Sequence, residues 1–151
     1  MRLMGLDVGD KTVGVAVSDE LGISAQPLTV IRRTDSIKKD LAEVRRLVEE
    51  YEVGRIVIGL PLMLNGTVGV QAQKVEEFAE GLRRRVRVPI VMWDERLSTS
   101  EIQRMLISDD QSRAKRKEVV DKLAASVILR SYMDSPQSRT QDDNGNTEVE
   151  Q

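Results

Sequence analysis

The stretch that decides the fold is RLMGLDVGDKTVGVAVS, residues 2–18. Its first part, residues 2–8, is an apolar run typical of a buried strand, and residues 12–18 alternate valine with small or polar residues. Gly9-Asp10 separates the two runs, at the position where a tight hairpin turns. This stretch therefore predicts two antiparallel strands joined by a short turn.

Beyond this hairpin, strand and helix patterns alternate along the chain. A third strand is predicted at residues 27–33, where Pro27 at its start does least harm to strand pairing. The following patterns are an amphipathic helix over residues 37–52, a strand over 55–61, a second helix marked by apolar residues from Val75 to Val86, and a strand over 89–93. This order predicts an α/β fold with βαβ units, parallel strands and helices on the faces of the sheet.

The last apolar segment is a helix over residues 118–133, which is apolar almost all round. We expect it to be buried against the sheet, with Ala124 and Ala125 permitting close approach. Residues 108–117 have no apolar periodicity and are predicted to form a mobile basic loop. Residues 134–151 carry five acids and one base and include a single apolar residue, which predicts a disordered acidic tail behind a domain of residues 1–133.

The composition excludes several kinds of catalysis. Histidine and cysteine are both absent, which removes Ser-His-Asp and Cys-His catalysis and every zinc site that needs those ligands. Aromatic residues make up 3% of the chain, so stacking surfaces for bases are scarce, and we expect Trp93 to be a core residue. No apolar run reaches the roughly 18 residues of a membrane span, and a chain without cysteine suits a reducing compartment. We therefore expect a cytoplasmic protein.

Four acids stand in apolar surroundings, namely Asp7, Asp94, Glu95 and Asp121. Asp7 and Glu95 follow strands that end at the same edge of the predicted sheet, where open α/β folds place ligands. If the last helix packs with its amino end at that edge, Asp121 completes an all-oxygen cluster suited to Mg²⁺ or Mn²⁺. With no histidine as a base, metal-activated water is the natural nucleophile for phosphodiester hydrolysis. The alternatives are a turn residue for Asp7 and an acid favoured by the helix dipole for Asp121.

Four segments together resemble one family: GLDVGDKTVGVAVSD (5–19), IVIGLPLMLNGTVG (56–69), WDERLSTSEI (93–102) and VVDKLAASVILRSYM (119–133). In this order they are similar to the YqgF/RuvX family of small bacterial ribonuclease-H-like proteins, described as Holliday junction resolvases and as nucleases that process pre-16S rRNA. The resemblance implies a ribonuclease-H-like mixed five-stranded sheet, with antiparallel hairpin strands and parallel strands, flanked by helices on both faces. It also implies that the three catalytic and metal-binding acids are Asp7, Glu95 and Asp121.

Several basic residues could contact the nucleic acid. Lys11 on the hairpin and Arg96 beside Glu95 could contact a scissile phosphate, or could be solvated or ion-paired charges. Four basic residues form a patch beside the expected site: Arg113, Lys115, Arg116 and Lys117. This patch would favour binding of a phosphate backbone. The alternative is an ordinary charged loop.

The favoured function is a nuclease, dependent on Mg²⁺ or Mn²⁺, that processes the 5′ end of pre-16S rRNA, with a Holliday junction resolvase acting on branched DNA as the alternative. Two further readings start from the same fold. The hairpin also resembles the phosphate-binding hairpin of the actin and hexokinase superfamily of ATPases, but those proteins close two such domains around ATP. The other interpretation is a non-catalytic nucleic-acid-binding factor with the same fold. The presence of all three acids, Asp7, Glu95 and Asp121, argues against it. No sequence feature fixes the oligomeric state, which could be a monomer or a homodimer, and a stable dimer would favour junction resolution.

Overall fold

The computed structural model describes residues 1–95, 113–136 and 138 of the chain. Their elements are β1 (Arg2–Val8), β2 (Thr12–Ser18), β3 (Ala25–Arg32), α1 (Ile37–Glu50), β4 (Val53–Leu60), α2 (Val70–Arg83), β5 (Ile90–Asp94) and α4 (Arg113–Met133). The described strands form a five-stranded sheet in the order β3-β2-β1-β4-β5. The pairs β1–β2 and β2–β3 are antiparallel, whereas β1–β4 and β4–β5 are parallel. The predicted mixed sheet is confirmed.

The hairpin closes as its sequence predicts. The Gly9 N–H donates a hydrogen bond of 2.8 Å to the Thr12 carbonyl, and β1 then pairs with β2 from Val8 opposite Val13 to Met4 opposite Val17. β3 begins two residues before the predicted start, so Pro27 lies inside the strand. This position is tolerated because β3 is an edge strand, whose outer N–H groups have no ladder partner to lose.

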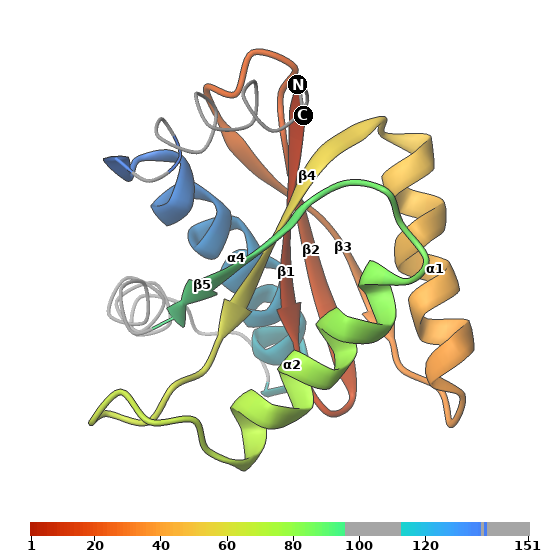
Figure 1. The fold of residues 1–151 in the computed structure, drawn as a ribbon, viewed down its shortest axis with the longest axis vertical. Coiled ribbons are helices and arrows are strands. Elements are labelled where there is room, and N and C mark those ends of the chain that lie inside the picture. The colour runs from red at the N-terminus through yellow and green to blue at the C-terminus, as the bar shows by residue number, and fades with distance from the viewer. Residues whose placement is uncertain (96–112, 137, 139–151) are drawn as a thin grey trace.

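Side chains alternate between two separate cores, one on each face of the sheet. Met4, Leu6, Val13 and Val15 are buried with the apolar residues of α1 and α2, and those two helices cover one face (Figure 1). On the other face, Leu3 and Val57 pack with α4 residues, namely Ala125, Ile128, Leu129 and Tyr132. Trp93 belongs to this second core as expected, with its ring 5.6 Å from that of Tyr132. The period of two along each strand therefore assigns every odd-numbered residue of β1 to the α4 face.

Glycines let α4 lie unusually close to the sheet. A Cβ atom at Gly5 would lie 2.7 Å from the Ala125 carbonyl oxygen, and a Cβ at Gly14 would overlap the main chain of Asp121. At Gly59 of β4, a Cβ would lie 2.5 Å from Cδ1 of Ile128. Ala125 itself is fully buried, in agreement with the close approach expected for it. The position of α4, and of any side chain it carries, is thus set by main-chain contact with β1 and β2.

α4 starts earlier than the sequence pattern predicts. Residues 113–117, expected in a mobile basic loop, are helical, and residues 108–112 lie outside the described residues. The error arises because apolar periodicity reports burial, while Arg, Ala, Lys and Glu form helix well without being buried. Asp121 therefore lies about two turns inside the helix, beyond the reach of the dipole at its first turn.

The region after α4 is described only in part. Ser138 donates hydrogen bonds from its hydroxyl to the carbonyls of Met133 (3.1 Å) and Ser135 (3.0 Å). Residues 139–151 of the predicted disordered tail lie outside the described residues, so the division of the chain at residue 133 stays a prediction. No helix in the described part of the chain is both long and apolar enough to span a bilayer.

A buried carboxylate at the start of α1 gives a first prediction. Asp40 is 2% exposed, and burial by itself raises the pKa of its carboxyl group. The carboxylate accepts hydrogen bonds from the Thr34 N–H (2.9 Å), the Thr34 hydroxyl (3.0 Å) and Arg33 (3.3 Å). These bonds outweigh burial, so the pKa of Asp40 lies below its usual value. Asp40→Asn should lower the free energy of unfolding by about 2–3 kcal/mol at pH 7, because it weakens a buried ionic network. Urea unfolding measures the change.

The matched control is Glu43→Gln, which breaks an exposed ion pair with Arg46 on the same helix and should cost less than about 1 kcal/mol. The pKa of Asp40 is lower in the folded state than in the unfolded chain. The carboxylate therefore contributes fully to the free energy of unfolding above pH about 4, and this contribution is lost as the pH falls through the pKa of the folded state. The difference between wild type and Asp40→Asn should therefore shrink in acid. Equal costs for the two variants at pH 7 would contradict this assignment.

Candidate active site

Asp7 lies near the carboxyl end of β1, on the face that α4 covers. It stands opposite Gly14 of β2, and the missing side chain of Gly14 leaves room there for the α4 main chain. The sequence positions Asp7 through simple alternation, because it is two residues from Gly5 and therefore projects to the same side. Its carboxyl group is thus held in the narrow space between the sheet and α4.

Glu95 follows β5 directly and reaches back over the neighbouring strand. A Cβ atom at Gly59 of β4 would lie 2.6 Å from Oε1 of Glu95, so the Glu95 side chain fills the place that this glycine leaves open. β4 lies between β1 and β5, and a side-chain hydrogen bond joins the carboxyl groups of Glu95 and Asp7. The structure therefore brings together two acids that are 88 positions apart in the sequence.

The two carboxyl groups both have raised pKa values, which favours a proton held between them at neutral pH. Burial, the charge of Asp7, the hydrogen bond to Asp7 and the charge of Asp94 together raise the pKa of Glu95 to about 8, with burial the largest cause. The pKa of Asp7 is also raised, by burial and by the charge of Asp121, while its bond to Glu95 acts in the opposite direction. Such shifts mark a site where a charge partner is expected.

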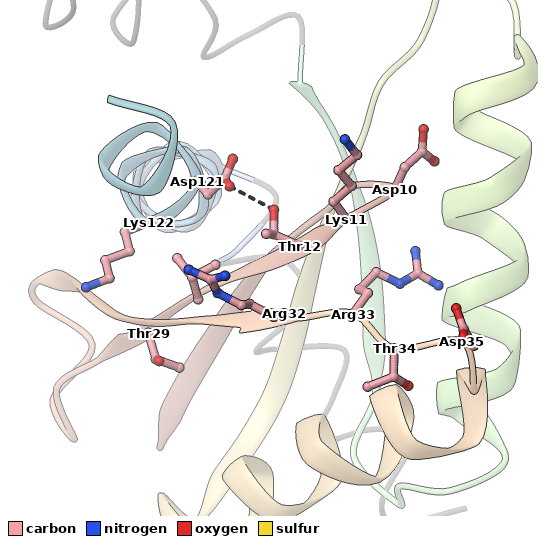
Figure 2. A pocket seen from close by; sticks show the side chains of 11 residues that line it. Asp10, Lys11, Thr12, Thr29, Arg32, Arg33, Thr34, Asp35, Asp121 and Lys122 are labelled. Atoms are coloured by element: carbon pink, nitrogen blue, oxygen red, sulfur yellow. Dashed lines mark hydrogen bonds between the residues drawn. The ribbon is translucent and has the colours of Figure 1, made fainter. Parts of the chain in front are cut away.

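Asp121 lies close enough to raise the pKa of Asp7, but its carboxylate has a different partner. Oδ2 of Asp121 accepts a hydrogen bond of 2.7 Å from the hydroxyl of Thr12 (Figure 2). Thr12 is the first residue of β2 and is two positions from Gly14, so it faces α4 as well. Sequence reasoning missed Thr12, although its two-residue spacing from Gly14 is the signal that could have found it.

The oxygen donors at this edge of the sheet match the chemistry of a divalent cation. Among the side chains that the structure describes, in residues 1–95 and 120–136, no three acids are grouped tightly enough to hold a metal ion as they stand. The set nevertheless fits one chemically: every donor is an oxygen, and the Asp7–Glu95 pair retains a proton that a cation would replace. Asp7, Glu95 and Asp121 are therefore the residues that would hold the ion.

The predicted basic contacts have mixed outcomes. Lys11 is exposed on the hairpin and lines a cavity beside Asp121. Arg96 lies outside the described residues. The four residues of the basic patch (Arg113, Lys115, Arg116 and Lys117) are on the first turns of α4, the helix that carries Asp121. Their helical placement replaces the predicted loop, and their contact with nucleic acid stays a prediction.

The shared proton gives a second prediction, on stability against pH. The pKa of Glu95 is higher in the folded state than its ordinary value of 4.5, so the folded protein holds a proton that the unfolded chain releases. Unfolding free energy must then fall as the pH rises from about 5 to 8. The melting temperature in EDTA should fall by several degrees over this range, and Glu95→Gln should lose most of that slope.

The control for this experiment is Glu77→Gln, the same chemical change at an exposed position of α2. It should follow the wild-type curve, because the Glu77 side chain is exposed and is not part of the Asp7–Glu95 pair. A Glu95→Gln curve parallel to wild type would show that the carboxyl pair is not protonated in the folded, metal-free protein.

A mixed five-stranded sheet in the order β3-β2-β1-β4-β5, with helices on both faces, is the ribonuclease-H-like fold. The same fold is found in "T. thermophilus RuvC in complex with Holliday junction substrate", with a TM-score of 0.58 and 15% identity over 87% of this chain and 94% of that one. A second match, "Thermus thermophilus RuvC structure", has a TM-score of 0.54 and 14% identity over 87% and 95% of the two chains.

The chain belongs to the family described as "RuvX: Holliday junction resolvase", which matches residues 1–135. A relative in Thermoanaerobacter pseudethanolicus is 56% identical over 92% of this chain and 100% of its own length. Another in Desulforamulus reducens is 56% identical over 89% and 98% of the two chains. Both carry the name "Putative pre-16S rRNA nuclease". The resemblance drawn from the four sequence segments is confirmed, and the protein is a hydrolase of the nuclease class. A nuclease fold of this kind implies dependence on a divalent cation.

Proposed function

We propose that this protein is an endonuclease, dependent on Mg²⁺ or Mn²⁺, that cleaves precursor 16S rRNA at its 5′ end in the cytoplasm. The observation that carries the proposal is the grouping of three acids at one edge of the sheet: Glu95 lies over Gly59 and is hydrogen-bonded to Asp7, and α4 places Asp121 beside Asp7. The names of the relatives, at 56% identity over nearly the whole chain, supply the substrate.

The proposed roles follow from the contacts of each side chain. Asp7 and Glu95 would bind the cation once they lose their shared proton, because buried carboxylates need a positive partner. Thr12 orients the Asp121 carboxylate by donating to Oδ2, and the contact of α4 with Gly14 keeps Asp121 beside Asp7. A divalent ion at such a site activates water and stabilises the charge that develops on the phosphate. These residues therefore provide binding and orientation.

Cleavage assays test this proposal. Purified protein with Mg²⁺ or Mn²⁺ should cut a labelled precursor rRNA fragment that spans the 5′ end of 16S rRNA, and EDTA should stop the reaction. Linear DNA of matched length serves as the control substrate. A protein that leaves the rRNA fragment intact under both metals would overturn the proposal.

A second candidate function is resolution of four-way DNA junctions, favoured by the description of the family as Holliday junction resolvases. Symmetric cutting of a junction needs two active sites related by a two-fold axis, so this function requires a homodimer. A labelled junction in the same assay, with light scattering to measure mass, separates the two functions. Junction cutting by a dimer, without rRNA cutting, would favour the second.

A further inference from the structure

A cavity of about 710 Å³ opens beside Asp121, on the β3 side of the acids. Its walls are the turn of the hairpin (residues 10–12), the end of β3 with the residues that follow it (residues 29–30 and 32–35), and residues 121–122 of α4 (Figure 2). Cavities of this size typically hold a small ligand or part of a larger one. Asp121 is part of its wall, so the cavity is continuous with the candidate active site.

Three acids line this cavity: Asp10, Asp35 and Asp121. Asp35 is exposed, and the other two have partners that reduce their effect on a bound anion. Asp10 lies 3.4 Å from Nζ of Lys74, and Asp121 accepts the hydroxyl of Thr12. Four cationic residues also line the walls: Lys11, Arg32, Arg33 and Lys122. Arg33 is directed to the other side, where it donates to the Gly9 carbonyl (2.8 Å). The other three are exposed and supply the positive charge at the cavity.

Strand register places Arg32 close to the acids. Arg32 is paired with Thr12 across β2 and β3, and paired residues project to the same face of a sheet. It therefore extends toward α4, on the same face as the Thr12–Asp121 contact (Figure 2). Lys122 follows Asp121 directly on α4. The two cations thus flank Asp121, one from the sheet and one from the helix.

The lining indicates which part of a nucleic acid would fit. Among the residues that the structure describes, no aromatic side chain lines the cavity, so this part of the lining offers no surface on which a base could stack. Thr29 and Thr34 add hydroxyl groups to the arginine and lysine side chains, and this combination is typical of contacts to phosphate and sugar. Recognition in this cavity would therefore be independent of base sequence.

We propose that this cavity binds a phosphodiester of the substrate strand next to the one that is cleaved, with Arg32 and Lys122 as the phosphate-binding residues. The inference rests on the proposed nuclease function. The strand would run from the Asp7–Glu95 pair past Asp121 and toward the β3 edge of the sheet. Binding there would hold the scissile phosphate over the acids without reading its sequence.

Binding titrations with a labelled single-stranded RNA, with Ca²⁺ in place of Mg²⁺, test the two cations. Arg32→Ala with Lys122→Ala should weaken binding at least 10-fold at low salt and flatten the log-log salt dependence by roughly 1.4, or about 0.7 for each lost contact. The matched control, Lys39→Ala with Arg130→Ala, removes the same number of charges at exposed positions that do not line the cavity. Equal losses in the two double variants would overturn the proposal.

Scanning the RNA with single neutral methylphosphonates locates the contact. One position beside the cut should weaken binding of the wild type and have no further effect on the Arg32→Ala/Lys122→Ala variant, because both changes remove the same contact. If no position behaves this way while the RNA is cut and the cut needs Asp7, this inference fails and the proposed function stands. If one position couples but no RNA is cut, the proposed function fails, and with it the placement next to a cut, while the phosphate contact of Arg32 and Lys122 stands.

The phosphate of a free mononucleotide could bind the same two cations. Adenosine monophosphate is therefore tested separately as a competitor of the RNA. If millimolar adenosine monophosphate displaces the RNA, and no methylphosphonate position couples to the two cations, the cavity is a nucleotide site and the proposal is overturned. Weak displacement together with one coupled position is the expected result, since a single phosphate lacks the rest of the strand.

Discussion

Asp7→Asn should lower the rate of metal-dependent cleavage by at least about 1000-fold, and Glu95→Gln should do the same. Both acids belong to one proton-sharing pair, and the members of such a site act as a unit. The double variant should therefore lose less than about 10-fold beyond either single one. Single-turnover cleavage of the labelled rRNA fragment at saturating enzyme measures the effect on the chemical step.

The control for this loss is Asp134→Asn, the same change at an exposed position after the end of α4. It should cut at the wild-type rate. Asp7→Asn should also melt no lower than wild type in EDTA, because burial raises the pKa of Asp7 and the amide removes a charge that the site disfavours. Wild-type turnover by both single variants would exclude this pair from the reaction.

Gly14→Ala should be the most damaging small substitution in the sheet. The new methyl group would overlap the carbonyl group of Asp121, and main-chain atoms cannot rotate away as a side chain can. We expect a loss of about 3 kcal/mol of stability and a fall in melting temperature of roughly 10 °C. Cleavage should fall as well, because the shift of α4 separates Asp121 from Thr12. Thermal melts and the cleavage assay measure both effects.

Gly69→Ala provides the comparison for Gly14→Ala. At Gly69 a Cβ atom would meet only the side chain of Met63, at 3.1 Å from its sulfur, and that side chain is flexible. This variant should melt within about 2 °C of wild type. Similar melting temperatures for the two variants would mean that α4 does not contact the main chain of β2.

Arg33 shows how far a local interpretation of the sequence can fall short. In the chain it is one of two arginines that end a predicted strand, with no feature to separate it from Arg32. In the fold, Arg33 lies 5.2 Å from the Phe78 ring, contacts Asp40 and donates to the Gly9 carbonyl. It therefore ties α1 and α2 to the hairpin, whereas Arg32 projects to the opposite face. The alternation of side chains along a strand indicates that Arg32 and Arg33 project to opposite faces of the sheet. It does not indicate which residues each arginine contacts.

The sequence by itself determined the hairpin, the parallel strands and the placement of two acids. Alternating valines and an apolar run are local patterns, and they report which residues of a strand are buried whatever the rest of the chain does. Parallel strands share their carboxyl edge, so Asp7 at the end of β1 and Glu95 after β5 had to meet there.

Only the tertiary structure decided where Asp121 lies and what surrounds it. Its position depends on three glycines in three strands, which let α4 descend onto the sheet, and on the hydroxyl of Thr12, which is 109 residues away. The cavity beside it likewise combines residues from the hairpin, β3 and α4. No local pattern encodes such contacts, because close packing depends on the shapes of surfaces that meet only once the chain has folded.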